Sequence, residues 1–68
     1  MEEFAKRLKE LRIEKGLSQV QLAEETGISK SAIGFWETGK RIPLATVVIT
    51  LAKYFGVTSD YLLGISDC

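Results

Sequence analysis

The sequence predicts an all-α domain of five short helices. Three observations support this prediction: apolar residues recur at helical spacing in several segments, glycines lie where those segments end, and serine or threonine stands where several begin. The chain has 68 residues, enough for one small core, which is marginal unless the helices pack compactly or the protein oligomerises. We therefore expect residues 1–68 to form a single compact domain.

The first helix is predicted over residues 2–15. Phe4, Leu8 and Leu11 recur at the spacing of one helix face, and acidic residues at the start of the segment complement the helix dipole. Gly16 is placed to end the helix. The remaining charged side chains are interpreted as a solvated outer face.

Two further helices are predicted over residues 18–26 and 29–37, joined by a tight turn. Ser18 and Ser29 are of the residue types that cap helix N-termini. Gly27 lies where the backbone often needs a positive φ after a helix. These signals define both ends of the turn.

The second of these two helices has two different faces when its residues are placed at intervals of about 100°. One face is apolar and can be buried; it consists of Ala32, Ile33 and Trp36. The other face offers a cation, a hydroxyl, a bare backbone and an aromatic ring; it consists of Lys30, Ser31, Gly34 and Phe35. Such a helix can dock on a small core and present its outer face to a DNA major groove.

The last two helices are predicted over residues 44–55 and 58–63. Pro43 precedes the first of them, and Gly56 and Gly64 follow the two segments. The apolar residues of the longer segment are spread more widely than one face of a small bundle needs: Leu44, Val47, Val48, Ile49, Leu51, Ala52 and Phe55. This helix is therefore either well buried or part of a protein interface.

Short segments that carry a family resemblance follow one another through most of the chain: Ser18-Gln19, Leu22-Ala23, Gly27-Ile28-Ser29, Ser31-Ala32-Ile33, Trp36-Glu37, Gly39-Lys40, Leu51 to Val57 and Asp60 to Gly64. In this order they resemble the Cro/repressor-type (XRE-like) helix-turn-helix family. The resemblance implies a compact, lambda-repressor-like DNA-binding domain with its helix-turn-helix at about residues 18–37. It also implies a transcriptional regulator that binds double-stranded DNA sequence-specifically and represses as a homodimer on a near-palindromic operator.

The resemblance also assigns roles to individual residues. Those expected at DNA phosphates or base edges are Ser18, Gln19, Ser29, Lys30, Ser31, Gly34, Phe35, Thr38, Lys40 and Arg41. An ion pair between Arg12 and Glu37 is expected to tie the first helix to the third. Candidates for the dimer contact are Tyr61, Leu63 and Ile65.

Two positions on the outer face of the third helix leave alternatives open. Gly34 allows either a close approach of the backbone to DNA or a tight helix contact inside the protein. Phe35 departs from the family, which usually has a polar or basic residue here. Its ring either touches thymine methyl groups, packs against a partner protein or folds back over the edge of the domain. The alternative function is a protein-interaction module, such as an antitoxin or regulatory partner with the same fold.

The composition argues against several other classes of protein. The chain has no histidine and no glycine-rich phosphate loop, so we expect neither an enzyme nor a cofactor site. Its nine basic and nine acidic residues balance, which argues against a histone-like, purely electrostatic DNA binder. The single cysteine, Cys68, can form neither an intrachain disulfide nor a zinc cluster, so no metal is expected. The N-terminus lacks a secretory signal and no segment is long enough to span a bilayer, so we expect a cytoplasmic protein.

Overall fold

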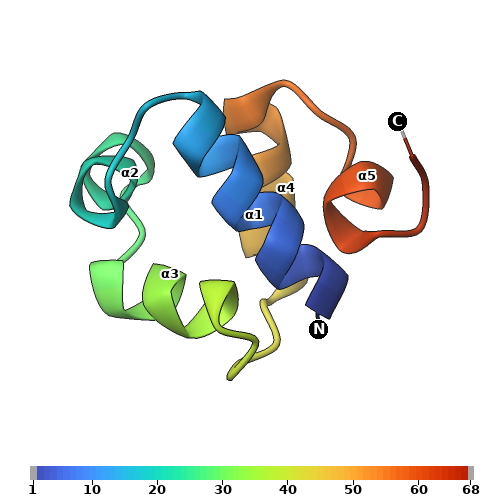
Figure 1. Cartoon of the computed structure of the whole chain (residues 1–68), viewed down its shortest axis with the longest axis horizontal. Coiled ribbons are helices and arrows are strands. Elements are labelled where there is room, and N and C mark those ends of the chain that lie inside the picture. The colour runs from blue at the N-terminus through green and yellow to red at the C-terminus, as the bar shows by residue number, and fades with distance from the viewer. Residues whose placement is uncertain (1, 68) are drawn as a thin grey trace.

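The computed structural model describes residues 2–67, which form five α-helices (Figure 1). They are α1 (Glu2–Glu14), α2 (Gln19–Thr26), α3 (Lys30–Glu37), α4 (Ala45–Phe55) and α5 (Ser59–Leu63). The predicted all-α, five-helix fold is thus confirmed, with each boundary within one residue of its predicted place. Four of the predicted first residues are N-caps rather than helical residues: Ser18, Ser29, Leu44 and Thr58.

The five helices form a single bundle around α1. In Figure 1, α1 crosses the middle of the molecule, with α2 and α3 on one side, α5 on the other and α4 behind it. α1 packs against α3 and α5, α2 packs against α3 and α4, and α4 also packs against α5. The molecule measures 28 × 23 × 20 Å, so side chains from all five helices reach one core.

The core is built from the apolar faces that the helical spacing predicts. Its buried members are Phe4, Leu8, Leu22, Ile33, Trp36, Val48, Leu51, Ala52 and Leu62. Phe4 and Trp36 meet edge to face, with ring centroids 6.4 Å apart and ring planes at 75°. This contact packs α1 against α3, and it confirms that Trp36 belongs to the core rather than to the outer face.

Local hydrogen bonds fix the N-terminus of α2 and the turn between α2 and α3. The Ser18 hydroxyl accepts a hydrogen bond from the backbone N–H of Gln21 at 3.0 Å, and the Gln21 side chain accepts one from the backbone N–H of Ser18 at 2.8 Å. This capping box satisfies two backbone donors at the start of α2. Gly27 ends α2 with a φ of 75°, and Ser29 caps α3 through the backbone N–H of Ala32.

The first half of α4 leaves apolar side chains outside the core. Its N-cap, Leu44, makes no side-chain hydrogen bond to the first turn and is 73% exposed, and Ile49 is 47% exposed. Ile49 also lines a groove between α4 and α5, here called the α4–α5 groove; its lining residues are Ile42, Pro43, Ala45, Val48, Ile49, Ser59 and Leu63. The prediction that the wide apolar surface of α4 is fully buried is therefore wrong. The alternative prediction, that this surface is part of a protein interface, remains.

Candidate nucleic-acid interface

The residues predicted to meet DNA come from three adjoining parts of the fold: the start of α2, the outward face of α3 and the loop after α3. We call them together the α3 surface: Ser18, Gln19, Ser29, Lys30, Ser31, Gly34, Phe35, Thr38, Lys40 and Arg41. All of them are exposed except Gln19 and Gly34, which are half-buried. The structure thus brings the predicted residues together on the outside of the helix-turn-helix.

The start of α2 lies against the middle of α3. A Cβ atom built on Gly34 would lie 3.7 Å from Oε1 of Gln19, which is an ordinary van der Waals distance. A methyl group therefore fits at position 34 without moving its neighbours. The explanation of Gly34 by a tight contact inside the protein is wrong, and a close approach from outside the protein is the alternative that remains.

A buried ion pair joins α1 to α3. Nε of Arg12 donates to Oε2 of Glu37 at 2.6 Å, and its second terminal nitrogen donates to Oε1 at 2.9 Å. The remaining terminal nitrogen donates to the backbone oxygen of Leu17 at 2.8 Å. The side chains are only 12% and 3% exposed, so solvent screens the pair weakly. The fork-shaped guanidinium therefore fixes the end of α3 against the end of α1.

Glu37 also orients Gln19. Nε2 of Gln19 donates to Oε1 of Glu37 at 3.3 Å, so Arg12, Glu37 and Gln19 form one network across three helices. Hydrogen bonding to Glu37 raises the pKa of the Arg12 guanidinium above its ordinary value, and this outweighs burial, which lowers it. Sequence reasoning named all three residues but missed the link from Glu37 to Gln19, because helical spacing does not show which side chains meet between helices.

The loop after α3 folds back onto the helix. Gly39 has a φ of 74°, its N–H donates to the Trp36 oxygen at 3.1 Å, and the N–H of Lys40 donates to the Phe35 oxygen at 2.8 Å. This pair of bonds is a Schellman motif, which reverses the chain. The reversal places the guanidinium carbon of Arg41 4.4 Å from the centroid of the Phe35 ring. Sequence reasoning named Phe35 and Arg41 separately; the glycine four residues after Phe35 was the signal that could have joined them.

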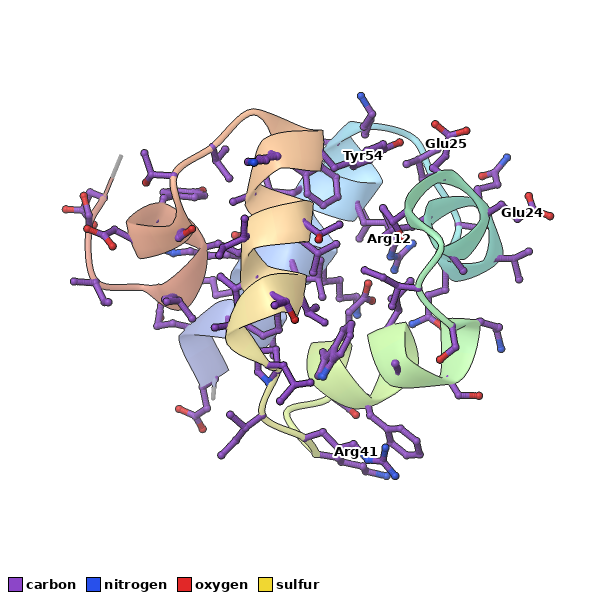
Figure 2. All side chains as sticks on the ribbon, turned by 180° about the vertical axis from the view of Figure 1, so that it is seen from behind. Arg12, Glu24, Glu25, Arg41 and Tyr54 are labelled. Carbon is purple, nitrogen blue, oxygen red and sulfur yellow. The ribbon has the colours of Figure 1, made fainter. Side chains whose placement is uncertain are left out.

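Charge is unevenly distributed around this surface. In Figure 2, Arg41 lies at the outer edge of the molecule beyond α3, whereas Glu24 and Glu25 lie at the far side of α2. Within residues 2–67, no ion pair joins Lys30, Lys40 or Arg41 to a carboxylate. Their charge is therefore available to an external anion, although the whole chain is neutral.

The described part of the chain offers no metal-binding group. Residues 2–67 contain no cluster of three histidine, cysteine, aspartate or glutamate side chains, and Cys68 lies outside the described residues. Among these residues no helix combines the length and the apolar character of a membrane span.

Comparisons with known proteins agree with this geometry. The family model described as "Helix-turn-helix" matches residues 8–62. The chain is 44% identical over 62 residues to the HTH-type transcriptional activator BcrR of Enterococcus faecalis, covering 91% of this chain and 30% of that protein. It is 31% identical over 64 residues to the cryptic phage CTXphi transcriptional repressor RstR of Vibrio cholerae, covering 94% of this chain and 58% of that protein.

A solved structure also resembles the chain closely. It is that of the restriction-modification controller protein C.AhdI from Aeromonas hydrophila, with a TM-score of 0.81 and 36% sequence identity over 90% of this chain and 92% of that one. The curated relatives are longer, since the chain spans between 30% and 58% of their lengths. The family match confirms the predicted resemblance and agrees with a domain that is not an enzyme.

The ion pair between Arg12 and Glu37 leads to a prediction about stability. Glu37→Ala is expected to lower the free energy of unfolding by about 3 kcal/mol, because it strands a buried guanidinium. Glu24→Ala, a control on the exposed face of α2, is expected to change it by less than about 0.5 kcal/mol. Equilibrium unfolding in urea measures both. Equal losses for the two variants would contradict a structural role for the pair.

Proposed function

We propose that this chain, which belongs to the helix-turn-helix family, uses the α3 surface to bind double-stranded DNA sequence-specifically, as part of a transcriptional regulator. The observation that carries the proposal is the outward face of α3, which presents unpaired polar and basic groups next to a bare backbone. The buried pair between Arg12 and Glu37 holds this face rigidly, and rigidity lowers the entropic cost of binding.

The proposed roles follow from position along α3. Lys30 and Ser31 lie in its first turn, the part of a recognition helix that contacts base edges. Gln19 lies at the N-terminus of α2, where backbone N–H groups favour a phosphate. One amide hydrogen of Gln19 points to Glu37, which leaves its second hydrogen for a phosphate oxygen. Lys40, in the exposed loop, is a second phosphate ligand.

The direction of regulation is a finer proposal. One of the relatives named above is an activator and another is a repressor. We propose repression, in which the bound domain occupies an operator and excludes other proteins from it. The curated relatives extend well beyond the part that this chain matches. Repression by a longer protein that contains this domain is therefore also a proposal.

We further propose that the regulator is a homodimer formed through the α4–α5 groove. Ile42, which lines the groove, is 77% exposed, and the groove has a volume of about 490 Å³. Ile65, another predicted dimer residue, is 72% exposed but does not line the groove. Leu63, one of the predicted dimer residues, lines it. Tyr61 is less available than expected, because the guanidinium of Arg7 lies 4.5 Å from the centroid of its ring. A two-fold pair would present two α3 helices one DNA turn apart, at roughly 34 Å.

Selection from a pool of random duplexes tests the proposed function. Sequencing of the retained DNA is expected to give a motif with two-fold symmetry.

The exposed α4–α5 groove also favours a second candidate, a protein-interaction module with the same fold. No enrichment at low salt by a folded protein would reject DNA binding and favour that module.

The distinction between base and phosphate contacts gives the second prediction. Lys30→Ala or Ser31→Ala is expected to weaken the selected site more than random DNA, because base contacts carry the specificity. Lys40→Ala is expected to weaken both about equally and to reduce the slope of log K against log salt by about 0.9. Fluorescence anisotropy with both duplexes measures these effects. Equal losses on both duplexes for the α3 variants would exclude base contacts by those residues.

Gly34 gives the third prediction. Gly34→Ala is expected to raise the free energy of unfolding by up to about 1 kcal/mol, because alanine favours the helix and its methyl group has room. The same variant is expected to weaken DNA binding, since the methyl group stands between the α3 backbone and DNA. Urea unfolding and anisotropy test the two halves. A stable variant with unchanged affinity would show that the backbone does not approach DNA closely.

The groove gives the fourth prediction. Ile49→Lys is expected to shift the protein from dimer to monomer in sedimentation, because it places a charge in an apolar contact. Ile13→Lys is the matched control, since Ile13 is also an exposed helical isoleucine, at 57% accessibility, but it does not line the groove. Dimers that survive Ile49→Lys but not Ile13→Lys would place the contact elsewhere.

A further inference from the structure

We propose that Phe35 is a positioning residue that holds Arg41 against a DNA phosphate, rather than a residue that reads bases itself. This inference rests on the proposed function, and it assigns a role to the position where the chain departs from its family. It is carried by the contact between the two side chains and by the backbone turn that brings them together.

The turn after α3 leaves the Arg41 side chain close to the ring. The hydrogen bonds from Gly39 to Trp36 and from Lys40 to Phe35 reverse the backbone directly before Arg41. The guanidinium carbon then lies 4.4 Å from the Phe35 ring centroid, within the distance of a cation–π interaction. Phe35 is 36% exposed, so the ring offers this contact at the surface and not inside the core.

The contact holds the guanidinium in place and leaves it free to bind. Within residues 2–67, no side-chain hydrogen bond or ion pair engages Arg41, so its five N–H donors remain available. A flexible arginine on an exposed loop loses conformational entropy when it binds. The ring restricts the side chain in advance, which reduces that loss.

Position favours a phosphate as the ligand over a base. Lys30 and Ser31 lie in the first turn of α3, the part of a recognition helix that reaches base edges, whereas Arg41 follows the opposite end of the helix. A guanidinium donates two parallel hydrogen bonds to a phosphate, which suits a fixed side chain. Because Arg41 lies over one face of the Phe35 ring, that face is not free to lie flat against thymine methyl groups.

A double-mutant cycle tests the proposal with a short mixed-sequence DNA duplex as the probe. Phe35→Leu keeps apolar bulk and removes the ring; Arg41→Gln removes the charge. Arg41→Gln is expected to lower the salt slope by about 0.9. Phe35→Leu is expected to weaken binding by about two- to fivefold when Arg41 is present, the fold-change that corresponds to an exposed cation–π contact. In the Arg41→Gln background, Phe35→Leu is expected to change the affinity very little.

Lys40 provides the matched control, because it lies in the same loop without an aromatic ring beneath it. Lys40→Gln is expected to lower the salt slope as Arg41→Gln does, yet to leave the effect of Phe35→Leu unchanged. If Phe35→Leu weakens binding equally with and without Arg41, the ring itself contacts DNA and the proposal is wrong. If Phe35→Leu has no effect in either background, the ring does not position Arg41 and the proposal is wrong as well.

A measurement without DNA separates this inference from the proposed function. In the free protein, the δ-methylene proton signals of Arg41 are expected to shift upfield through the ring current of Phe35 and to return to ordinary values in Phe35→Leu. Absence of this shift would overturn the inference even if the protein binds DNA. Failure of the wild-type protein to bind any duplex, with the shift present, would instead overturn the proposed function and the phosphate role that rests on it.

Discussion

The geometry of the α3 surface depends on the buried ion pair between Arg12 and Glu37. This pair joins the last turn of α1 to the last residue of α3, and the hydrogen bond from Gln19 adds the start of α2. Apolar contacts are non-directional, so with the core alone small rotations and shifts of α3 would cost little free energy. A forked, buried pair tolerates them poorly, because a stranded charge is costly. The direction in which α3 presents its outer face is therefore set by polar contacts behind it.

The same helix end determines where the basic loop lies. Glu37 is the last residue of α3, and the chain reverses at Gly39, so Arg41 returns to the ring of Phe35. A fixed helix end followed by a fixed turn gives an exposed side chain a defined place without burying it. Because the acidic residues Glu24 and Glu25 lie on another side of the molecule, the neutral chain still presents a basic surface.

Local signals account for most of the fold that the sequence predicts, and contacts between distant residues account for what it misses. Ser18 and Ser29 act through hydrogen bonds to residues three positions away, so cap patterns locate helix boundaries within one residue. Arg12 and Glu37 are 25 positions apart, and family resemblance rather than periodicity points to them. The contact between Phe35 and Arg41 was missed because helical periodicity ends with α3, whereas the turn beyond it decides where Arg41 lies.

The loop after α3 links the α4–α5 groove to the α3 surface, because Arg41 and Ile42 are neighbours in it. A chain of 68 residues has little apolar surface to spare, yet Ile42 and Leu44 remain outside its core, and Leu44 stands where a polar cap would suit the local sequence. Arg41 lies over Phe35, while its neighbour Ile42 lines the groove. A second copy seated in the groove would restrain Ile42 and, with it, the loop that carries Arg41. Dimerisation and phosphate contact would then favour each other. Each would restrict the conformations of this loop, so the second event would lose less conformational entropy than it would alone.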